Sequence, residues 1–146
     1  MIQIRLHRIA TKLLRAVAWL LIVVISVLSL VPPSHRPVTG TPHNFEHFAI
    51  FMLTGLAFGL GYHFRHLSQA AGLIAFAGAI EIAQYWVPGR HARIGDFIVD
   101  AMSACIGVVA AWLAIQALNR YGSIARGDRR NLGASHQRTK YASDST

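Results

Sequence analysis

The sequence contains one cysteine, Cys105, among its 146 residues. A single thiol has no intramolecular partner, which excludes a disulfide-stabilised fold and a paired-cysteine metal site. The H-E-x-x-H and G-x-S-x-G patterns of metalloproteases and serine hydrolases are also absent. Because Cys105 lies in an apolar stretch, we expect it to be a small buried residue and not a reactive thiol.

Charged residues are scarce as well. They form 14% of the chain against 53% hydrophobic residues, and the mean hydropathy is +0.40. This composition suits either a small apolar soluble domain or a compact membrane bundle. About 20 apolar residues cross the roughly 30 Å of a bilayer's hydrocarbon, and four stretches approach that length: 16–31, 47–64, 70–87 and 97–118. We therefore predict an all-α fold, a bundle of four transmembrane helices in one domain over residues 1–118.

Acidic residues are few, six against 14 lysines and arginines, for a net charge of +8. Such a balance would suit nucleic acid, but the basic residues flank the apolar stretches and form no face of a soluble module, so no nucleic-acid partner is predicted. With four spans, all basic residues except Arg36, Arg90 and Arg93 fall on one side. The positive-inside rule then places both termini in the cytoplasm, and the chain in the cytoplasmic membrane.

The two ends of the chain differ from its apolar middle. Basic and apolar residues alternate at helical spacing along 1–15, which predicts a basic amphipathic N-terminal extension on an anionic membrane surface. A cleaved signal peptide is the alternative, although the apolar stretch is longer than usual and no A-x-A-like site follows. Residues 119–146 are polar and basic, which predicts a flexible cytoplasmic tail.

Three carboxylates interrupt the apolar stretches near the middle of the chain: Glu81, Asp96 and Asp100. A charged group inside a membrane costs about 2.5–3.5 kcal/mol, so each one needs a partner, water or a function. Glu81 shares a helix face with Gln84, and Asp100 shares one with small residues that suit helix contact, so both should face the bundle interior. Asp96 alone has a simpler role open to it, as a helix N-cap.

Polar residues of three stretches should meet at the outer end of the bundle. The second stretch enters there, the third leaves there and the fourth enters there again, which gathers His47, Glu81, Gln84, Asp96 and Asp100. Arg90 and Arg93 follow a Pro-Gly turn above the same end. Guanidinium groups there would either hold a carboxylate or phosphate or simply anchor the loop at the headgroups.

These residues resemble the VanZ-like family of small bacterial membrane proteins. The matching positions are His47-Phe48, Glu81 with Gln84, Pro88-Gly89-Arg90, Asp96, Asp100 and Gly107, within residues 43–107. The departures are His43-Asn44 where many members have Asp-Lys, Asp100 where asparagine is usual, and Ser103 in place of a glycine. The resemblance implies a multi-pass protein of the bacterial inner membrane and cell envelope, related to one associated with low-level teicoplanin resistance. It implies no particular reaction.

We expect the polar end to bind, and in a stronger form of the hypothesis to modify, a cell-envelope precursor or lipid headgroup, with an anionic lipid-linked or cell-wall ligand as partner. Glu81, Asp100 and His47 are the candidate catalytic residues, and Gln84, Arg90, Arg93 and Asp96 the candidate ligand-binding residues. No cofactor or metal is predicted, although His47, Glu81 and Asp100 are a conceivable metal set. The main alternative is a non-enzymatic scaffold or interaction protein whose buried charges fix helix packing. A proton or ion pathway is disfavoured, because the polar residues gather near one face.

Overall fold

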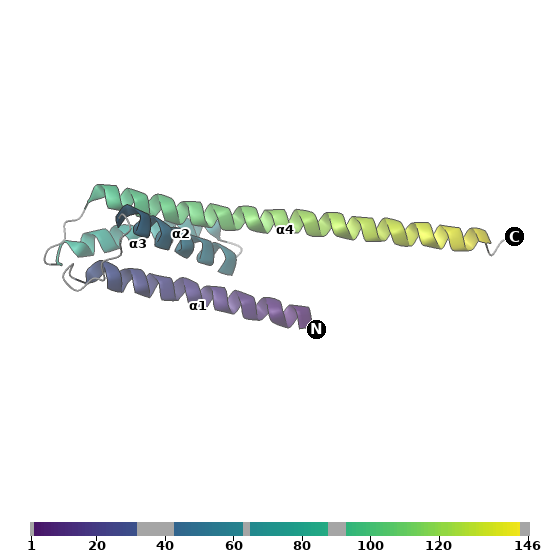
Figure 1. Ribbon diagram of the computed structural model, residues 1–146, viewed down its shortest axis with the longest axis horizontal. Helices are drawn as coiled ribbons and strands as arrows, with labels where there is room; N and C mark the ends of the chain where they lie inside the picture. Colours follow the sequence, from purple (N-terminus) through teal and green to yellow (C-terminus); the bar gives the residue numbers. More distant parts are fainter. Residues whose placement is uncertain (1, 32–42, 63–64, 88–92, 144–146) are drawn as a thin grey trace. The chain divides into compact units, whose positions relative to one another are not determined.

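The computed structural model describes residues 2–31, 43–62, 65–87 and 93–143. The elements in these ranges are helices: α1 (Ile2–Leu30), α2 (His43–Gly61), α3 (His66–Gln84) and α4 (Ile94–Ser143), as Figure 1 shows. No strand occurs within the described ranges. The prediction of an all-α chain with four helices is therefore confirmed.

Three of these helices contain segments long and apolar enough to cross a membrane: Arg8–Leu30, His66–Gln84 and Ile94–Gly122. The described apolar part of α2, Phe45–Gly61, is shorter than the roughly 20 residues that a full crossing needs. The chain thus has the helices of a membrane protein, while the complete passage of α2 across the bilayer stays a prediction.

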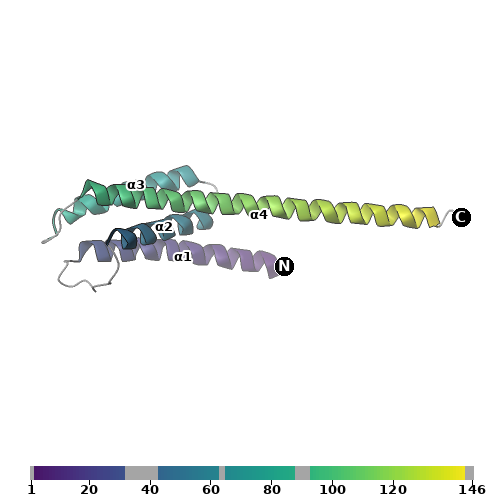
Figure 2. The ribbon, with the colours of Figure 1, turned by 45° about the horizontal axis from the view of Figure 1, so that its top comes forward.

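The chain divides into two compact units, Met1–Trp112 and Leu113–Thr146. Within the first unit, consecutive helical segments alternate in direction and run side by side (Figures 1 and 2). As a result, α2 and α4 begin at the end of this unit where α1 and α3 finish.

Helix α4 continues to Ser143, so the stretch predicted to be a flexible tail after residue 118 is helical. No proline follows Pro88, and alanine and arginine, both good helix formers, recur along this stretch. Gly122, Gly127 and Gly133 are weak helix formers, but unlike proline they keep the backbone N–H that the helix needs. The division of the chain at residue 118 into a transmembrane domain and a separate segment stays a prediction.

Helix α2 packs closely against the first part of α4 through small residues. A Cβ atom on Gly55 would collide with the carbonyl group of Ala104, and one on Gly107 would collide with the backbone of Met52 and Leu56. Membrane helices associate without a hydrophobic driving force, so close backbone contact has to supply the van der Waals energy instead. Gly55 and Gly59 form a G-x-x-x-G spacing, the pattern that lets a neighbouring backbone approach this closely.

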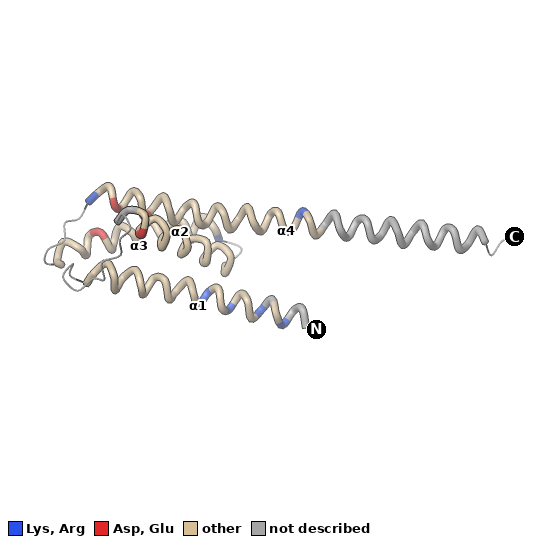
Figure 3. The backbone as a smooth tube through the Cα atoms, in the orientation of Figure 1, with Lys and Arg blue, Asp and Glu red and all other residues tan. Residues whose placement is uncertain are grey.

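Charges are distributed unevenly within the first unit. The acidic residues of α2, α3 and α4 lie at the end where α2 and α4 begin, whereas the basic residues of α1 lie toward its N-terminus (Figure 3). Large apolar side chains such as Trp19, Leu20 and Val23 are exposed between these ends, as expected of a surface that faces lipid. The orientation of the two ends relative to the cytoplasm stays a prediction.

The packing of α2 against α4 gives a first prediction. Alanine at Gly55 or Gly107 should lower the free energy of unfolding by about 1–3 kcal/mol, because overpacking outweighs the better helix propensity of alanine. Gly72→Ala is the matched control, since no atom lies within 4 Å of a Cβ placed there. Thermal unfolding in detergent measures the difference, and equal midpoints for all three variants would contradict the described packing.

Candidate functional site

A histidine and an aspartate pair inside the bundle, one from α2 and one from α4. Nδ1 of His47 lies 3.1 Å from Oδ1 and 3.3 Å from Oδ2 of Asp100. The two residues are only 7% and 2% exposed. An ionised carboxylate accepts hydrogen bonds and donates none, so in that state the proton between them belongs to Nδ1 of His47. The pair fixes the orientation of the imidazole ring.

Helix positions explain why these two side chains meet. His47 lies in the second turn of α2 and Asp100 in the second turn of α4, and both helices start at the same end of the unit. Gly55, two turns after His47, and Ser103, one turn after Asp100, are small enough to bring the two backbones together. Phe51, one turn after His47, stacks on the imidazole with ring centroids 6.5 Å apart and closes the apolar side of the pair.

Glu81 joins α3 to the start of α4. Its carboxylate accepts a hydrogen bond from the backbone N–H of Arg93, in the residue just before α4. The carboxylate thereby satisfies one of the N–H groups that a helix leaves unpaired at its beginning, where negative charge is also favoured. Glu81 is 9% exposed, so this contact is largely shielded from solvent.

The polar groups of α3 and α4 act on one another. Asp96, Asp100 and His47 all interact electrostatically with Glu81. Gln84, one turn after Glu81, is buried at 5% exposure. The structure therefore brings together His47, Glu81, Gln84, Asp96 and Asp100 at one end of three helices. None of these helices could gather them alone.

The remaining predicted residues fall into two groups. Asp96 is half-buried and the side chain of Arg93 is exposed, so neither lies as deep as the histidine–aspartate pair. Arg90 lies outside the described residues, and the predicted guanidinium clamp is therefore represented only by Arg93.

Two hydroxyl groups are also buried beside the pair. Thr54 and Ser103 are fully buried, and each hydroxyl donates to a carbonyl one turn earlier in its own helix, that of Ile50 and of Val99 respectively. These bonds satisfy the hydroxyl donors within one helix. Ser103 and Thr54 thus line the inner boundary of the polar cluster, and the charged and amide groups stop there.

A histidine held by a carboxylate, with a second carboxylate nearby, can accept and return a proton. The same residue types bind divalent metals. Within the described ranges, however, no group of three or more His, Cys, Asp or Glu side chains has an arrangement that could hold a metal ion. The side chains themselves can offer proton transfer and hydrogen bonding.

One contact of the site has no signal in the sequence. The partner of Glu81 is a backbone N–H group, which every residue except proline carries, so no residue type at position 93 identifies it. The stacking of Phe51 on His47, in contrast, follows from a spacing of four residues on one helix. A contact between two side chains of one helix can be predicted from their spacing in the sequence, whereas a contact between a side chain and the backbone of another helix cannot.

The sequence model of one protein family, described as VanZ/LLP1, matches residues 5–115 of the chain. No curated protein and no solved structure matches the chain. The matched range includes each residue of the polar cluster and extends over most of the described part of α1.

The buried pair gives a second prediction. His47→Ala or Asp100→Ala should each lower the free energy of unfolding by about 3–5 kcal/mol, because the remaining partner is left buried and uncompensated. The double variant should lose less than the sum, with a coupling energy of about 1–3 kcal/mol. Thermal or denaturant unfolding in detergent measures the free energy of unfolding of the original chain, the two single variants and the double variant, which together form a double-mutant cycle.

A second double-mutant cycle, in which Ser26→Ala replaces His47→Ala as the partner of Asp100→Ala, is the control. The hydroxyl of Ser26 donates to the Ile22 carbonyl within α1, so its loss should add independently to that of Asp100. Simple additivity in the His47 and Asp100 cycle would show that the two side chains do not interact.

Proposed function

The chain belongs to the VanZ/LLP1 family, and we propose that it is a membrane protein whose polar end binds the headgroup of a cell-envelope precursor. The site consists of His47 from α2, Glu81 and Gln84 from α3, and Asp100 from α4. Arg93 and Asp96 border it. In this proposal the polar end faces the outer side of the cytoplasmic membrane, with both termini in the cytoplasm.

One observation carries the proposal: four buried polar side chains from three helices gather at one end of the unit. The His47–Asp100 pair alone would join α2 to α4. Glu81 and Gln84 add a carboxylate and an amide at the same end, both about nine-tenths buried. Buried polar groups in a membrane protein are costly and mark ligand or ion sites by default.

The residue types indicate the chemistry of the ligand. Carboxylates and the amide oxygen of Gln84 accept hydrogen bonds from hydroxyl, amide or ammonium groups, and an arginine at the border binds phosphate. A phosphorylated headgroup that also carries hydroxyl or amide donors matches both requirements. Lipid-linked cell-wall precursors, which join a diphosphate to an amidated sugar, have this chemistry.

The residues also allow a reaction, which is the stronger form of the proposal. His47 can accept a proton from a bound hydroxyl group while Asp100 stabilises the imidazolium that forms. Either binding or modification of a cell-wall precursor would affect susceptibility to glycopeptides, which agrees with the teicoplanin resistance associated with a relative in the VanZ-like family.

A scaffold function is the second candidate, and a specific observation favours it. The His47–Asp100 pair connects α2 to α4, and the Glu81 carboxylate connects α3 to the start of α4. Both contacts would also fix helix register in a protein that binds no small ligand. Buried ion pairs often contribute little net stability, so their presence alone does not identify a reaction.

A third prediction tests binding directly. Glu81→Gln and Asp100→Asn keep the side-chain shape but remove a carboxylate, so each should weaken binding of a polyprenyl-diphosphate-linked disaccharide pentapeptide about ten- to a hundredfold, as expected for loss of a hydrogen bond to a charged group. Binding to the detergent-solubilised chain can be followed by native mass spectrometry. Teicoplanin susceptibility of an expressing host provides a cellular readout.

Glu46→Gln is the matched control for these variants. Glu46 lies in the first turn of α2, at the same end of the unit, but outside the proposed site. Its variant should bind the precursor as the original chain does. Unchanged binding by Glu81→Gln and Asp100→Asn, at normal protein levels, would refute the proposed binding site.

A fourth prediction separates the ligand site from the scaffold. Exchanging the partners, His47→Asp with Asp100→His, should restore most of the stability lost in either single exchange, because the pair can form again between α2 and α4. Precursor binding should remain weak, since the carboxylate and the imidazole have changed places. A swapped protein that regained both its stability and the cellular phenotype would favour the scaffold function.

A further inference from the structure

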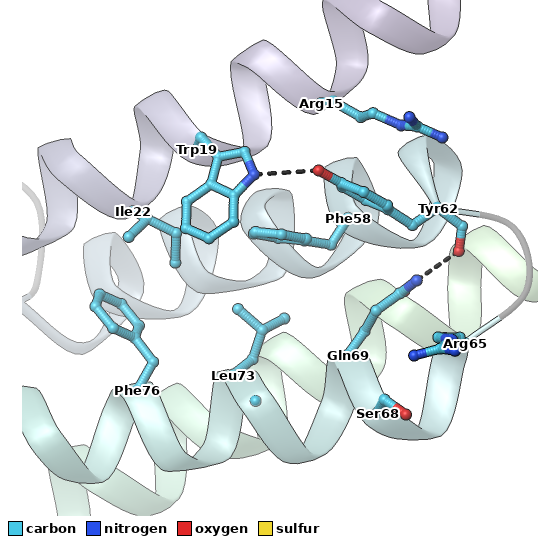
Figure 4. Close-up of a pocket in the computed structure, with 11 residues that line it drawn as sticks. Arg15, Trp19, Ile22, Phe58, Tyr62, Arg65, Ser68, Gln69, Leu73 and Phe76 are labelled. Carbon is cyan, nitrogen blue, oxygen red and sulfur yellow. Dashed lines mark hydrogen bonds between the residues drawn. The ribbon is translucent and has the colours of Figure 1, made fainter.

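We propose that the chain binds an anionic phospholipid, phosphatidylglycerol in the test below, in a second site at the opposite end of the first unit. A cavity of about 570 Å³ opens there between α1, α2 and α3 (Figure 4). Its volume is in the range typical of ligand pockets. This inference is independent of the proposed function, because the two sites share no residue.

The polar end of the cavity lies far from the polar cluster, although the apolar end reaches Phe76, whose ring contacts that of Phe51. Tyr62, which lines it, follows His47 by 15 residues along α2, a distance of about 22 Å at the rise of an α-helix. It is also close to the short connection between α2 and α3, where the positive-inside rule predicts the cytoplasmic surface. The charged groups of the two sites should therefore lie in opposite leaflets of the bilayer.

The walls of the cavity are apolar and partly aromatic. Trp19 and Ile22 of α1 face Phe58 of α2 and Leu73 and Phe76 of α3 across it (Figure 4). Trp19 packs edge-to-face against Phe58, with ring centroids 5.6 Å apart. None of the described residues that line the cavity carries a carboxylate. Such walls accommodate an acyl chain.

Arginines stand at the polar end of the same cavity. Arg15 donates through Nε to the carbonyl of Gly61 at 2.8 Å, and its guanidinium lies 4.5 Å from the centre of the Tyr62 ring. The bond to Gly61 uses one of the five N–H groups of the guanidinium. Arg65, the residue directly before α3, is the second cation that lines the cavity, and its side chain is exposed. Two cations and no anion select a negatively charged headgroup.

The polar end is also incomplete without a ligand. Gln69 donates to the carbonyl of Tyr62 (Figure 4), but its Oε1 is buried with no hydrogen-bond partner in the described part of the chain. Buried polar atoms are normally paired. The hydroxyl groups of a glycerol headgroup can supply such partners.

Headgroup charge, and not the acyl chain, should decide the preference. A lipid tail in the bilayer is already in an apolar medium, so its transfer into an apolar cavity gains little. The phosphate, in contrast, exchanges water for two guanidinium groups in a region of lower dielectric. Basic pockets between membrane helices on the cytoplasmic side recognise anionic headgroups in this way.

Tryptophan fluorescence of the full chain tests the proposal. The sequence contains three tryptophans, so Trp86→Phe with Trp112→Phe leaves Trp19, in the wall of the cavity, as the single reporter. The chain is placed in phosphatidylcholine vesicles that contain either phosphatidylglycerol or phosphatidylcholine brominated on its acyl chains, because bromine quenches a nearby tryptophan. The mole fraction of brominated lipid that halves the fluorescence of Trp19 should be about fivefold or more lower for phosphatidylglycerol than for phosphatidylcholine. Equal quenching by the two lipids would overturn the proposal.

Three variants distinguish the cavity from the general attraction of a basic protein for anionic lipid. Arg65→Gln, and independently Arg15→Gln, should make the mole fractions of the two brominated lipids that halve the Trp19 fluorescence nearly equal, so that their ratio is close to one. Lys12→Gln, which removes an exposed charge from the same helix outside the cavity, should leave the ratio unchanged. If Lys12→Gln reduces the ratio as much as Arg65→Gln does, the lipid preference belongs to the membrane surface and the pocket is refuted.

A second reporter completes the test. With Trp19→Phe and Trp86→Phe, the remaining Trp112 of α4 lies outside the cavity and should respond equally to both brominated lipids. A preference for phosphatidylglycerol at Trp112 equal to that at Trp19 would contradict a localised site. Because vesicles carry the lipid in both leaflets, the result does not depend on the orientation of the inserted chain.

Discussion

The close contact between the backbones of α2 and α4 is the constraint on which the polar site depends. Gly55 meets the carbonyl of Ala104, and Gly107 meets the backbone around Met52. At this separation the side chains at the start of both helices, His47 and Asp100, come within hydrogen-bond distance. Larger residues at the glycine positions would separate the helices and leave each polar group buried alone, which is far costlier than burying the pair.

The two ends of the first unit combine the same apolar helices with opposite chemistry. At one end the helices contribute carboxylates, an amide and a histidine, which accept hydrogen bonds and move protons. At the other end, Arg15 and Arg65 border an apolar cavity whose described lining residues include no carboxylate. Both sites use polar groups near helix ends, because the middle of each helix must stay apolar to lie in the bilayer. The two proposed sites therefore lie toward the two ends of the helices.

Much of this arrangement could be predicted from the sequence, because it follows from residue spacing within single helices. The four helices follow from apolar run length, and the close approach of α2 from Gly55 and Gly59. The direct pairing of His47 with Asp100 depends on the rotation of two helices about their axes, which no pattern within either helix specifies. The bond from the Arg93 backbone to Glu81 involves no characteristic residue. The cavity near Trp19 is formed by three helices together, so it also has no local signal.

The length of α4 shows where composition alone misleads. The polar and basic stretch after residue 118 has the composition of a disordered segment, yet it is helical to Ser143. Composition measures whether a segment can bury a core, and this stretch has little to bury. A helix that is already formed in the apolar part needs no new nucleation to continue, because each added residue gains one hydrogen bond. In the absence of proline, the helix can then continue even through glycine and other weak helix formers.

The aspartate at position 100 gives the site a chemistry that its usual counterpart in the VanZ-like family would not. An asparagine opposite His47 can donate through its amide or accept through its oxygen, so either tautomer of the histidine would be satisfied. An ionised aspartate only accepts, which requires the proton on Nδ1 and makes Nε2 the basic nitrogen of a neutral ring. It also stabilises the ring when Nε2 takes up a proton. Of the three departures from the expected family pattern, this one thus supports the proposal that His47 acts as a base and does more than hold two helices together.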